Sequence, residues 1–499
     1  MHRISNSQTT WALHGTARSR QIEQQAGNAL PPHTLMRRAG TALARLALAL
    51  APHARTVWIA AGPGNNGGDG LEAAITLLHA GKDVHVTLVG DAATLPADAR
   101  DAHARAVAAG VRVGTQIAPP LEAQDLALDA LLGLGASRAP HGLIAQLIEQ
   151  LNTLPCPVLA VDLPSGLDAG SGQTLGEICV RAAHTLSLLT LKPGLVTGHG
   201  RDHAGEIWFD DLGAGGHATP PDAWLTGAME AAAARPRRGH AQHKGSFGDV
   251  AVVGGATGMT GAALLAARAA HAAGAGRVFV GLLDDAHLAL DITRPELMFR
   301  KAWWHSPPEV IAATTVVCGC GGGDAVRAAA PKLLSLAPRL VLDADALNAI
   351  AADASLQTLL EARAGRGHAT VLTPHPLEAA RLCNTSTAQV QADRVASAQA
   401  LAERFACTVL LKGSGSVIAA PGRVPHINPT GNASLATAGT GDVLAGWLGG
   451  LWAQGADGGG AQRAFAVAVA AAHAHGAAAD DAGQTPLRAA DLIERLLLG

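Results

Sequence analysis

The chain has 499 residues, and a prior of about 150 residues per domain predicts two to four domains rather than one compact core. Its composition is rich in alanine and glycine, with 3% aromatic residues, no tyrosine and a formal net charge of -3. Lysine and arginine are scattered and form no basic stripe with interleaved aromatic side chains, so the composition argues against nucleic acid as a partner.

The sequence predicts neither a membrane span nor a secretory signal. The amino terminus, MHRISNSQTTWALHG, lacks the apolar core of a signal peptide, and no apolar run reaches the length of a membrane span. Six cysteines lie far apart except for Cys318 and Cys320, which form a C-x-C pair without C-x-x-C or Cys/His ligand spacing. We expect reduced, mostly buried thiols in a cytoplasmic protein.

Short β-branched runs alternate with Ala/Leu-rich segments along the whole chain, which is typical of α/β domains built on parallel sheets. In the first half the runs are TVWIAA (56–61), DVHVTLVG (83–90), LALDALLG (126–133) and PVLAVDLPSG (157–166). In the second half they are GDVAVVGG, GRVFVGLL, TTVVCG, RLVLDADALN, ATVLTPHPLE and CTVLLKG. The segment from Gly213 to Gly239 is rich in Gly, Pro and Ala. We therefore predict two large α/β domains, 1–215 and 240–499, with a linker at 216–239.

Polar residues at the ends of these runs are the candidates for function, because ligands of open α/β sheets bind outside the carboxyl ends of the strands. In the first half this rule selects Asn65, Asn66, Asp69, Asp129, Asp162 and Ser165. In the second half it selects Asp345, Asn348, His375, Lys412 and Asp442.

The first-half loop GPGNNGGDG, residues 62–70, matches G-x-G-x-x-G between a strand and a helix, and Asp91 follows the next strand at the spacing of a ribose-binding acid. A dinucleotide site is therefore one interpretation. The asparagines and the aspartate instead supply side-chain oxygens, which suit a polar ligand or a monovalent cation. Asp129 and Ser165 could complete an oxygen cage with Asn66, although each alone could be a turn residue that bonds its own backbone.

The second-half segment NPTGNASLATAGTGDVLAG, residues 428–446, places one carboxylate where a glycine-rich turn leads into a helix. The backbone N–H groups of Gly439, Thr440 and Gly441 can converge on an anion at the positive end of that helix. Asp442 could then deprotonate an incoming hydroxyl, as in phosphoryl transfer. The alternative is that Asp442 only caps the helix.

The first half resembles the NAD(P)H-hydrate epimerase domain, a Rossmann-like fold. The matching segments are LMRRAGTALA, GPGNNGGDGLEAA, LDALLGLGASR and AVDLPSGLDAGSG. The resemblance implies that potassium is held by Asn66, Asp129 and Ser165. It implies a substrate pocket, with Asp162 as our candidate for proton transfer, formed by Asn65, Asn66, Gly67, Gly68, Asp69, Gly133, Leu134, Gly135, Ala136, Ser137, Arg138, Ala139 and Asp162.

The second half is similar to the ADP-dependent NAD(P)H-hydrate dehydratase, a ribokinase-like domain, through HKGSFGDVAVVGG, GMTGAALLAARAA, VLDADALN, LTPHPLEAARL, LLKGSGSVI and the GTGD segment. The resemblance implies contacts to the hydrate from Ala262, Gly321, His375 and Asp442. It implies an ADP site formed by Lys412, Gly413, Ser414, Gly415, Ser416, Asn432, Ala433, Ser434, Leu435, Ala436, Thr437, Ala438, Gly439, Thr440 and Gly441. On local grounds His375 could equally cap the helix that begins near Pro376.

Three motifs depart from the family pattern. The usual GPGLG is CGCGGG here, around Gly319 to Gly323, while GYTGA is GMTGA and KGAGT is KGSGS. Met259 removes an aromatic face that could have stacked on the ligand. These departures weaken individual contacts rather than the assignment.

Together the resemblances cover nearly the whole chain and imply a fused bifunctional enzyme, isomerase and lyase, for the repair of hydrated NADH and NADPH. The implied cofactors are potassium for the epimerase and magnesium with ADP for the dehydratase. The implied partners are the hydrates and ADP, and we expect a homo-oligomer, a tetramer or larger. Two alternatives stay open: a small-alcohol or vitamin kinase of the ribokinase-like class, and a noncatalytic first half that only binds protein.

Overall fold

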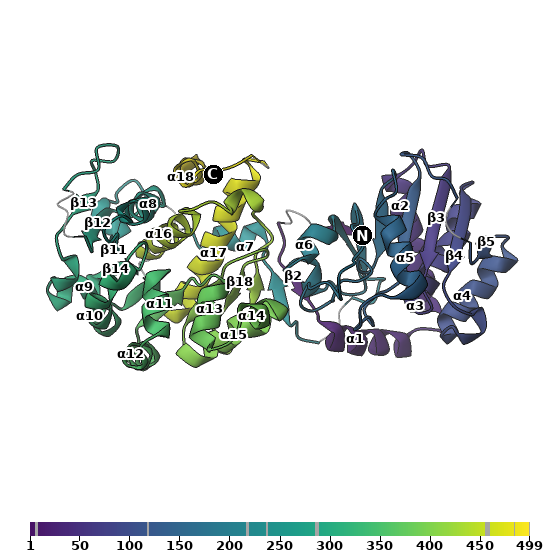
Figure 1. The fold of residues 1–499 in the computed structure, drawn as a ribbon, viewed down its shortest axis with the longest axis horizontal. Coiled ribbons are helices and arrows are strands. Elements are labelled where there is room, and N and C mark those ends of the chain that lie inside the picture. Colours follow the sequence, from purple (N-terminus) through teal and green to yellow (C-terminus); the bar gives the residue numbers. More distant parts are fainter. Residues whose placement is uncertain are drawn as a thin grey trace. The chain divides into compact units, whose positions relative to one another are not determined.

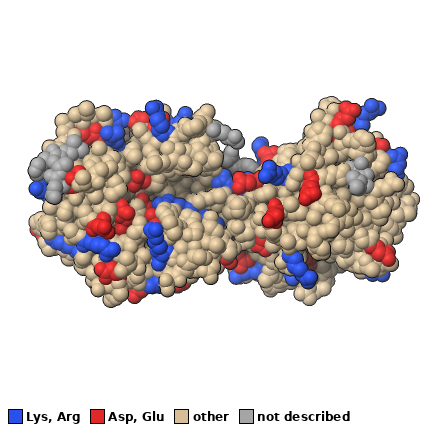
Figure 2. Space-filling model, in the orientation of Figure 1, with Lys and Arg blue, Asp and Glu red and all other residues tan. Residues whose placement is uncertain are grey.

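The computed structural model describes residues 1–4, 8–116, 119–215, 219–235, 238–284, 289–454, 460–483 and 485–498. The chain divides into two compact units, one formed mainly by residues 11–223 and the other by residues 224–499 (Figure 1). Acidic and basic side chains are interspersed on the face drawn in Figure 2, in keeping with the scattered charge of the sequence. None of the described helices is long and apolar enough to cross a bilayer.

The first unit is built on a sheet whose order reverses at its centre, β1-β9-β8-β7-β6-β3-β4-β5. All neighbours are parallel except β1 and β9. The carboxyl ends of β3 and β6 therefore lie at the switch point where open α/β sheets bind ligands. The strands are β1 (His2–Arg3), β3 (Thr56–Ala61), β4 (Asp83–Leu88), β5 (Arg112–Gly114), β6 (Leu126–Ala130), β7 (Val158–Val161), β8 (His184–Leu188) and β9 (Glu206–Asp210).

Successive side chains of β3 point into two different apolar cores, one on each face of this sheet. Ile59 packs in one apolar core with Leu43 of α2 and Leu71 of α3, and α4 contributes Ala99 to the same core. Trp58 and Ala60 face the opposite core, which α5 closes with Leu147, Ile148 and Leu151. Successive residues of a strand point to opposite faces, so a run that is buried throughout requires a layer of helix on each side. The helices of this unit are α1 (Thr16–Ala29), α2 (Thr34–Leu50), α3 (Asn65–His79), α4 (Ala97–Ala108), α5 (Gly142–Leu151) and α6 (Gly200–His203).

The second unit has the larger sheet, in the order β13-β12-β11-β14-β15-β16-β17-β18-β19-β10. Its central strands from β12 to β17 are parallel, and β18 runs antiparallel to both neighbours. The strands are β10 (Ala223–Leu225), β11 (Asp249–Gly254), β12 (Arg277–Leu282), β13 (Met298–Phe299), β14 (Thr314–Cys318), β15 (Arg339–Leu342), β16 (Ala369–Leu372), β17 (Thr408–Leu411), β18 (Val417–Ala419) and β19 (His426–Ile427).

Four helices of this unit share one core with the sheet, α8 (Thr260–Ala272), α16 (Thr440–Ala453), α17 (Ala461–Asp480) and α18 (Ala489–Leu498). A second group packs on the strands, with α9 on β14, α12 on β16 and α15 on β17 (Figure 1). That group comprises α9 (Pro308–Ala313), α10 (Ala330–Leu336), α11 (Asp345–Ala351), α12 (Ala354–Gly365), α13 (Pro376–Cys383), α14 (Thr387–Ala392) and α15 (Arg394–Phe405). Both units thus have the three-layer α/β architecture that the sequence predicted.

The segment predicted as a linker, 216–239, contains ordered elements of the second unit. Its residues 216–218 and 236–237 lie outside the described part of the chain. Trp224 and Leu225 of β10 pair with β19, and α7 (Ala228–Ala233) packs against α17. Leu225 is fully buried, and the division between the units falls at Ala223 and Trp224. Two apolar residues are enough to add a strand here, and the surrounding Gly and Pro residues concealed them in the sequence.

Candidate active sites

A cavity of about 610 Å³ opens at the carboxyl ends of the strands in the first unit. It is lined from α1, from the turn after β3, and from the segments that follow β6, β7 and β8. Eight of the predicted substrate-binding residues line it, Asn65, Asn66, Asp69, Gly133, Leu134, Gly135, Ala136 and Asp162.

The other predicted residues of this pocket lie elsewhere. Gly67 is buried beneath the turn, where a Cβ atom would meet the carbonyl oxygen of Gly62 at 2.0 Å. Gly68 packs against Met36 and Ala99, and Ser137 to Ala139 are exposed beyond the cavity. Asp91, the ribose-binding acid of the dinucleotide alternative, instead caps a short 3-10 helix by accepting the N–H of Ala93 at 2.9 Å.

Asp162 is held at the cavity wall by a buried ion pair with Lys192. The ammonium of Lys192 donates to Oδ1 of Asp162 and, at 2.8 Å, to the carbonyl oxygen of Leu188. Asp162 has φ 67, in the left-handed region that a non-glycine residue rarely adopts. Strain of this kind is retained where the surroundings over-determine it, often at functional sites. The backbone and the ion pair together fix the direction of the Asp162 carboxylate.

Two further carboxyl groups face the same cavity. Burial, together with the negative charge of Asp162, raises the pKa of Asp69 well above its usual range and also raises the pKa of Glu23. The cavity therefore combines a lysine-paired carboxylate with carboxyl groups that favour the protonated form. Groups whose environments push their pKa values apart are suited to acid and base roles.

The predicted cation ligands lie next to this cavity, in and after β6 and β7. Asp129 is fully buried, and its carboxylate accepts the N–H of Ser165 at 2.7 Å and the hydroxyl of Ser165 at 2.5 Å. Burial raises the pKa of Asp129 to about 6, and only hydrogen bonds from Ser165 and Leu131 oppose that shift. No lysine or arginine of the described chain contributes to this balance.

Asn66 stands beside the same segment. A Cβ atom on Gly133 would lie 2.9 Å from Oδ1 of Asn66, and the buried Nδ2 of Asn66 has no hydrogen-bond partner among the described residues. A buried carboxylate without a cationic partner fits a monovalent cation bound by oxygen, and Oδ1 is the atom of Asn66 that could ligate it. The structure thus brings Asp129 and Ser165 into direct contact. Asn66 lies against Gly133, and the preceding residue, Leu132, donates its N–H to the hydroxyl of Ser165.

In the second unit, Asp442 is the third residue of α16, behind a glycine turn. Gly439 has φ 93 and precedes the first helical residue without a side-chain cap. The carbonyl oxygen of Thr440 lies 2.9 Å from Nε2 of His475, and burial lowers the pKa of His475 to about 4. His475 is therefore neutral and donates this hydrogen bond, which fixes the start of the helix.

Asp442 faces a buried cluster that contains Asp343, Cys320 and Lys412. Burial first, and then the charge of Asp343, raise the pKa of Asp442 to about 6. Nζ of Lys412 lies 2.7 Å from Oδ1 of Asp343, so the lysine that we assigned to the nucleotide also compensates the carboxylates here. These interactions and its position in α16 favour a chemical role for Asp442 over a cap.

His375 has the capping role that the sequence left open. Its Nδ1 accepts the N–H groups of Leu377 and Glu378 at 3.1 Å and 3.3 Å, and its own N–H donates to Glu378 at 2.7 Å. Burial raises the pKa of Glu378 to about 7 and lowers that of His375. Nε2 of the half-exposed ring lies 3.2 Å from Oε1 of Glu378, so a ligand that uses the predicted role of His375 would have to share or replace this contact.

Ala262 and Gly321 are neighbours, because a Cβ atom on Gly321 would lie 2.8 Å from Cβ of Ala262. Gly321 has φ 58, so the loop after β14 can approach the start of α8 closely only with glycine at this position.

The predicted ADP residues fall in two places. Asn432, Ala433, Ser434, Ala436 and Thr437 line a second cavity of about 410 Å³ together with Pro486. The loop from Lys412 to Ser416 rests on the buried guanidinium of Arg394, which donates to the carbonyl oxygens of Leu411, Lys412 and Gly415. Burial lowers the pKa of Arg394 to about 10, so Arg394 stays charged.

Sequence reasoning missed Lys192, Glu23, Asp343 and Cys320. Asp343 directly follows β15, so the strand-end rule should have selected it together with Asp345. Lys192 follows β8 by four residues, and Glu23 lies in the middle of α1, ten residues after the preceding strand β2 (Trp11–Leu13) ends. Cys320 was expected to be an ordinary buried thiol.

Two family models match the chain. The model for the YjeF-related protein N-terminus matches residues 32–194, and the model for NAD(P)H-hydrate dehydratase matches residues 250–497. The chain is 36% identical over 495 residues to the bifunctional NAD(P)H-hydrate repair enzyme Nnr of Escherichia coli, which covers 96% of this chain and 90% of the relative. The chain belongs to the family of bifunctional NAD(P)H-hydrate repair enzymes.

A second relative agrees with this assignment. The repair enzyme Nnr of Moorella thermoacetica is 36% identical over 477 residues, covering 89% of this chain and 87% of the relative. Among solved structures, the ADP/ATP-dependent NAD(P)H-hydrate dehydratase of Bacillus subtilis, co-crystallised with ATP/Mg2+, is 27% identical with a TM-score of 0.43 and covers 54% of this chain and 94% of that chain. The small-alcohol kinase and the noncatalytic first half, which the sequence left open, do not fit this family.

Replacing Lys192 tests how much its buried ion pair with Asp162 contributes to the stability of the first unit. In Lys192→Met the carboxylate of Asp162 loses its cation in a mostly buried position, and we expect a loss of about 3–5 kcal/mol in the free energy of unfolding of the first unit. Urea unfolding followed by circular dichroism measures this loss. The double variant Lys192→Met/Asp162→Asn, which removes both charges, should recover more than half of it. A single-variant loss below about 1 kcal/mol, the range of exposed pairs, would contradict the ion pair.

Proposed function

We propose that the chain repairs hydrated nicotinamide cofactors in two steps. The first unit interconverts the R and S epimers of NAD(P)H hydrate, and the second unit dehydrates the S epimer to NAD(P)H with ADP, releasing AMP and phosphate. The observation that carries the second step is the partly buried Asp442 carboxylate behind the Gly439 turn, beside the pair of Asp343 and Lys412. The names of the relatives, bifunctional repair enzymes, support the pairing of both steps.

The dehydration follows from the chemistry of the substrate. The hydrate carries a hydroxyl on a ring carbon beside nitrogen, and hydroxide is a poor leaving group near neutral pH. Asp442 takes the proton of this hydroxyl, whose oxygen attacks the β-phosphorus of ADP while AMP leaves. The N–H groups of residues 439–441 hold the phosphoryl oxygens, and ADP arrives as its magnesium complex. The ring nitrogen then expels phosphate, and loss of a ring proton restores the reduced dinucleotide.

The epimerisation needs a proton taken from oxygen and a proton given to nitrogen. The hydrated carbon bears both a hydroxyl and the ring nitrogen, so its C–N bond can open to an aldehyde and an enamine and close again on the other face. Asp162 accepts the hydroxyl proton, and Asp69, whose raised pKa favours the protonated form, donates to nitrogen. Lys192 keeps the Asp162 carboxylate directed into the cavity.

A monovalent cation, potassium, would be held by Asn66, Asp129 and Ser165. It would supply positive charge beside the first cavity and compensate the buried carboxylate of Asp129. The free thiols suit the reducing cytoplasm that we propose as the compartment, and the homo-oligomer stays a prediction.

Two matched variants separate the two chemical steps. Asp442→Asn keeps the shape of the side chain but removes the base, so ADP-dependent NADH recovery from the S epimer should fall by about two to four orders of magnitude. Epimerisation in this variant should be unchanged. In Asp162→Asn the R epimer should recover only at the rate of spontaneous interconversion, whereas the S epimer is dehydrated normally.

Absorbance of NADH at saturating ADP measures recovery, and thermal melting verifies that each variant is folded. A folded Asp442→Asn protein within threefold of the wild-type dehydration rate would overturn the proposed mechanism of the second unit.

Potassium should support epimerisation better than smaller ions. Sodium or lithium at equal ionic strength should give slower epimerisation, because Asn66, Asp129 and Ser165 would have to close around a smaller ion. Chromatography of the R and S epimers over time measures the rate, and dehydration of pure S epimer serves as the internal control. Equal epimerisation rates in the three salts would contradict the oxygen cage.

A further inference from the structure

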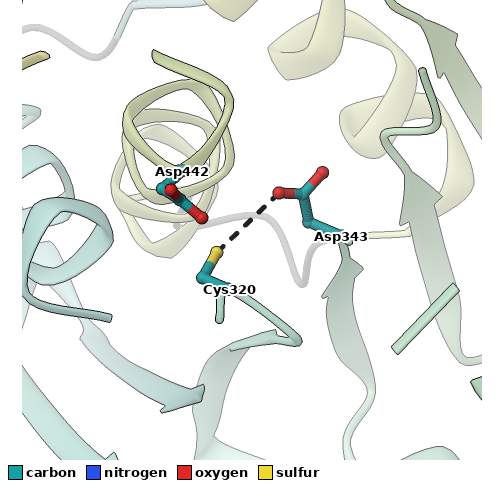
Figure 3. Close-up of side chains that lie close together, drawn as sticks. All are labelled: Cys320, Asp343 and Asp442. Carbon is teal, nitrogen blue, oxygen red and sulfur yellow. Dashed lines mark hydrogen bonds between the residues drawn. The ribbon is translucent and has the colours of Figure 1, made fainter. Parts of the chain in front are cut away.

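Three potential metal ligands converge in the second unit, and within the described residues no other group of three or more does so. One ligand atom from each of Cys320, Asp343 and Asp442 lies within 4.8 Å of the other two (Figure 3). Cys320 comes from the loop after β14, Asp343 directly follows β15, and Asp442 lies in the first turn of α16. The cluster therefore depends on the tertiary fold and not on local sequence spacing.

The two oxygens of Asp343 have different surroundings. Oδ1 accepts from Nζ of Lys412 and from the hydroxyl of Thr373, each at 2.7 Å. Oδ2 faces Sγ of Cys320 at 3.9 Å (Figure 3). In a tetrahedral zinc site, with bonds of about 2.3 Å to sulfur and 2.0 Å to oxygen, neighbouring ligand atoms lie roughly 3.5 Å apart. A shift of well under 1 Å would bring these two atoms to that separation, while Lys412 and Thr373 hold the orientation of the carboxylate.

The charge of the cluster also favours a divalent cation. With a metal bound, a thiolate at Cys320 and two carboxylates would give three negative charges, and Lys412 supplies one positive charge, so two negative charges would remain to balance the divalent cation. Cys320 and Asp343 are buried, with exposed fractions of 0% and 2%, where uncompensated charge is costly. A sulfur ligand selects zinc or cadmium over magnesium, which prefers oxygen alone.

The cysteine at position 320 departs from the family pattern. The family pattern GPGLG has proline at the position that Cys320 occupies, between Gly319 and Gly321. Cys318 is also buried, but it lies in β14 and outside the cluster. The two cysteines therefore form a matched pair for testing.

We propose that Cys320, Asp343 and Asp442 bind a thiophilic divalent cation of the zinc class, and that this cation inhibits the dehydratase step. On binding, the thiol of Cys320 releases its proton to solvent and forms a sulfur–metal bond, and the carboxylates supply the other two ligands. The inhibition rests on the proposed function, because Asp442 cannot accept the substrate's proton while it coordinates a metal. Binding itself does not depend on that function.

Binding is tested with cadmium, whose bond to a thiolate gives an ultraviolet charge-transfer absorption. Reduced full-length protein is titrated with Cd²⁺ in the presence of excess Mg²⁺, in the wild type, Cys320→Ala and Cys318→Ala. We expect one cadmium–thiolate per chain in the wild type and Cys318→Ala, and loss of that absorption in Cys320→Ala. No absorption in the wild type, or full absorption in Cys320→Ala, would overturn the site. If Cys320→Ala does not melt cooperatively, Cys320→Ser takes its place, because a hydroxyl cannot give the thiolate band.

Inhibition is tested with zinc on the same proteins. Zn²⁺ in slight excess over protein should slow dehydration of the S epimer at least tenfold in the wild type and Cys318→Ala, and less than twofold in Cys320→Ala. Epimerisation by the first unit serves as the control and should keep its rate. Cadmium binding without zinc inhibition would overturn the inhibitory role and leave the metal site intact. The dehydration rate of Asp442→Asn tests the proposed function separately.

Discussion

A buried pair of lysine and aspartate at the carboxyl edge of the sheet organises the candidate site in each unit. Asp162 directly follows β7 and pairs with Lys192, and Asp343 directly follows β15 and pairs with Lys412. A single buried charge would cost several kcal/mol, so neither partner can leave without a large penalty. The pair therefore fixes a carboxylate at the place where parallel strands deliver ligands.

Each pair sets the electrostatics of the carboxyl groups around it. In the first unit, the charge of Asp162 contributes to the raised pKa of Asp69 and Glu23. In the second unit, the charge of Asp343 contributes to the raised pKa of Asp442, while Lys412 opposes it. Both sites thus place a fixed anion beside a carboxyl group whose pKa is raised, which suits proton transfer to and from the hydrate.

Much of the fold and part of each site could be predicted from local sequence. Buried β-branched runs predicted the two three-layer units, and glycine-rich turns after strands located Asn65, Asp162 and Asp442. The strand-end rule selected Lys412 but not Lys192, and neither ion pair could be predicted locally, because Lys192 and Lys412 reach their aspartates across 30 and 69 residues of sequence. The same limit concealed Cys320, whose neighbours are fixed only by the fold.

The structure differs from the sequence-based predictions at two other places, and both differences have local causes. Gly67 and Gly68 were assigned to the ligand because they lie in the motif, but the helix α3 begins at Asn65 and turns both glycines inward. The expected linker was predicted from its Gly and Pro content, which does not reveal that Leu225 is buried in a strand. Composition describes a segment on average, whereas one buried leucine contributes about 2 kcal/mol and can decide where the segment packs.

The central claim is that a partly buried carboxyl group in the first turn of α16, Asp442, acts as the base of the dehydratase. The most direct measurement is the pH dependence of the dehydration rate at saturating S epimer and ADP, corrected for spontaneous loss of the hydrate. Below its pKa Asp442 is protonated and cannot accept the hydroxyl proton, so the rate should rise with pH through a midpoint near the pKa of about 6 and then level off. A rate that is constant from about pH 5 to pH 8, or a midpoint near the ordinary aspartate value of about 3.9, would contradict the account.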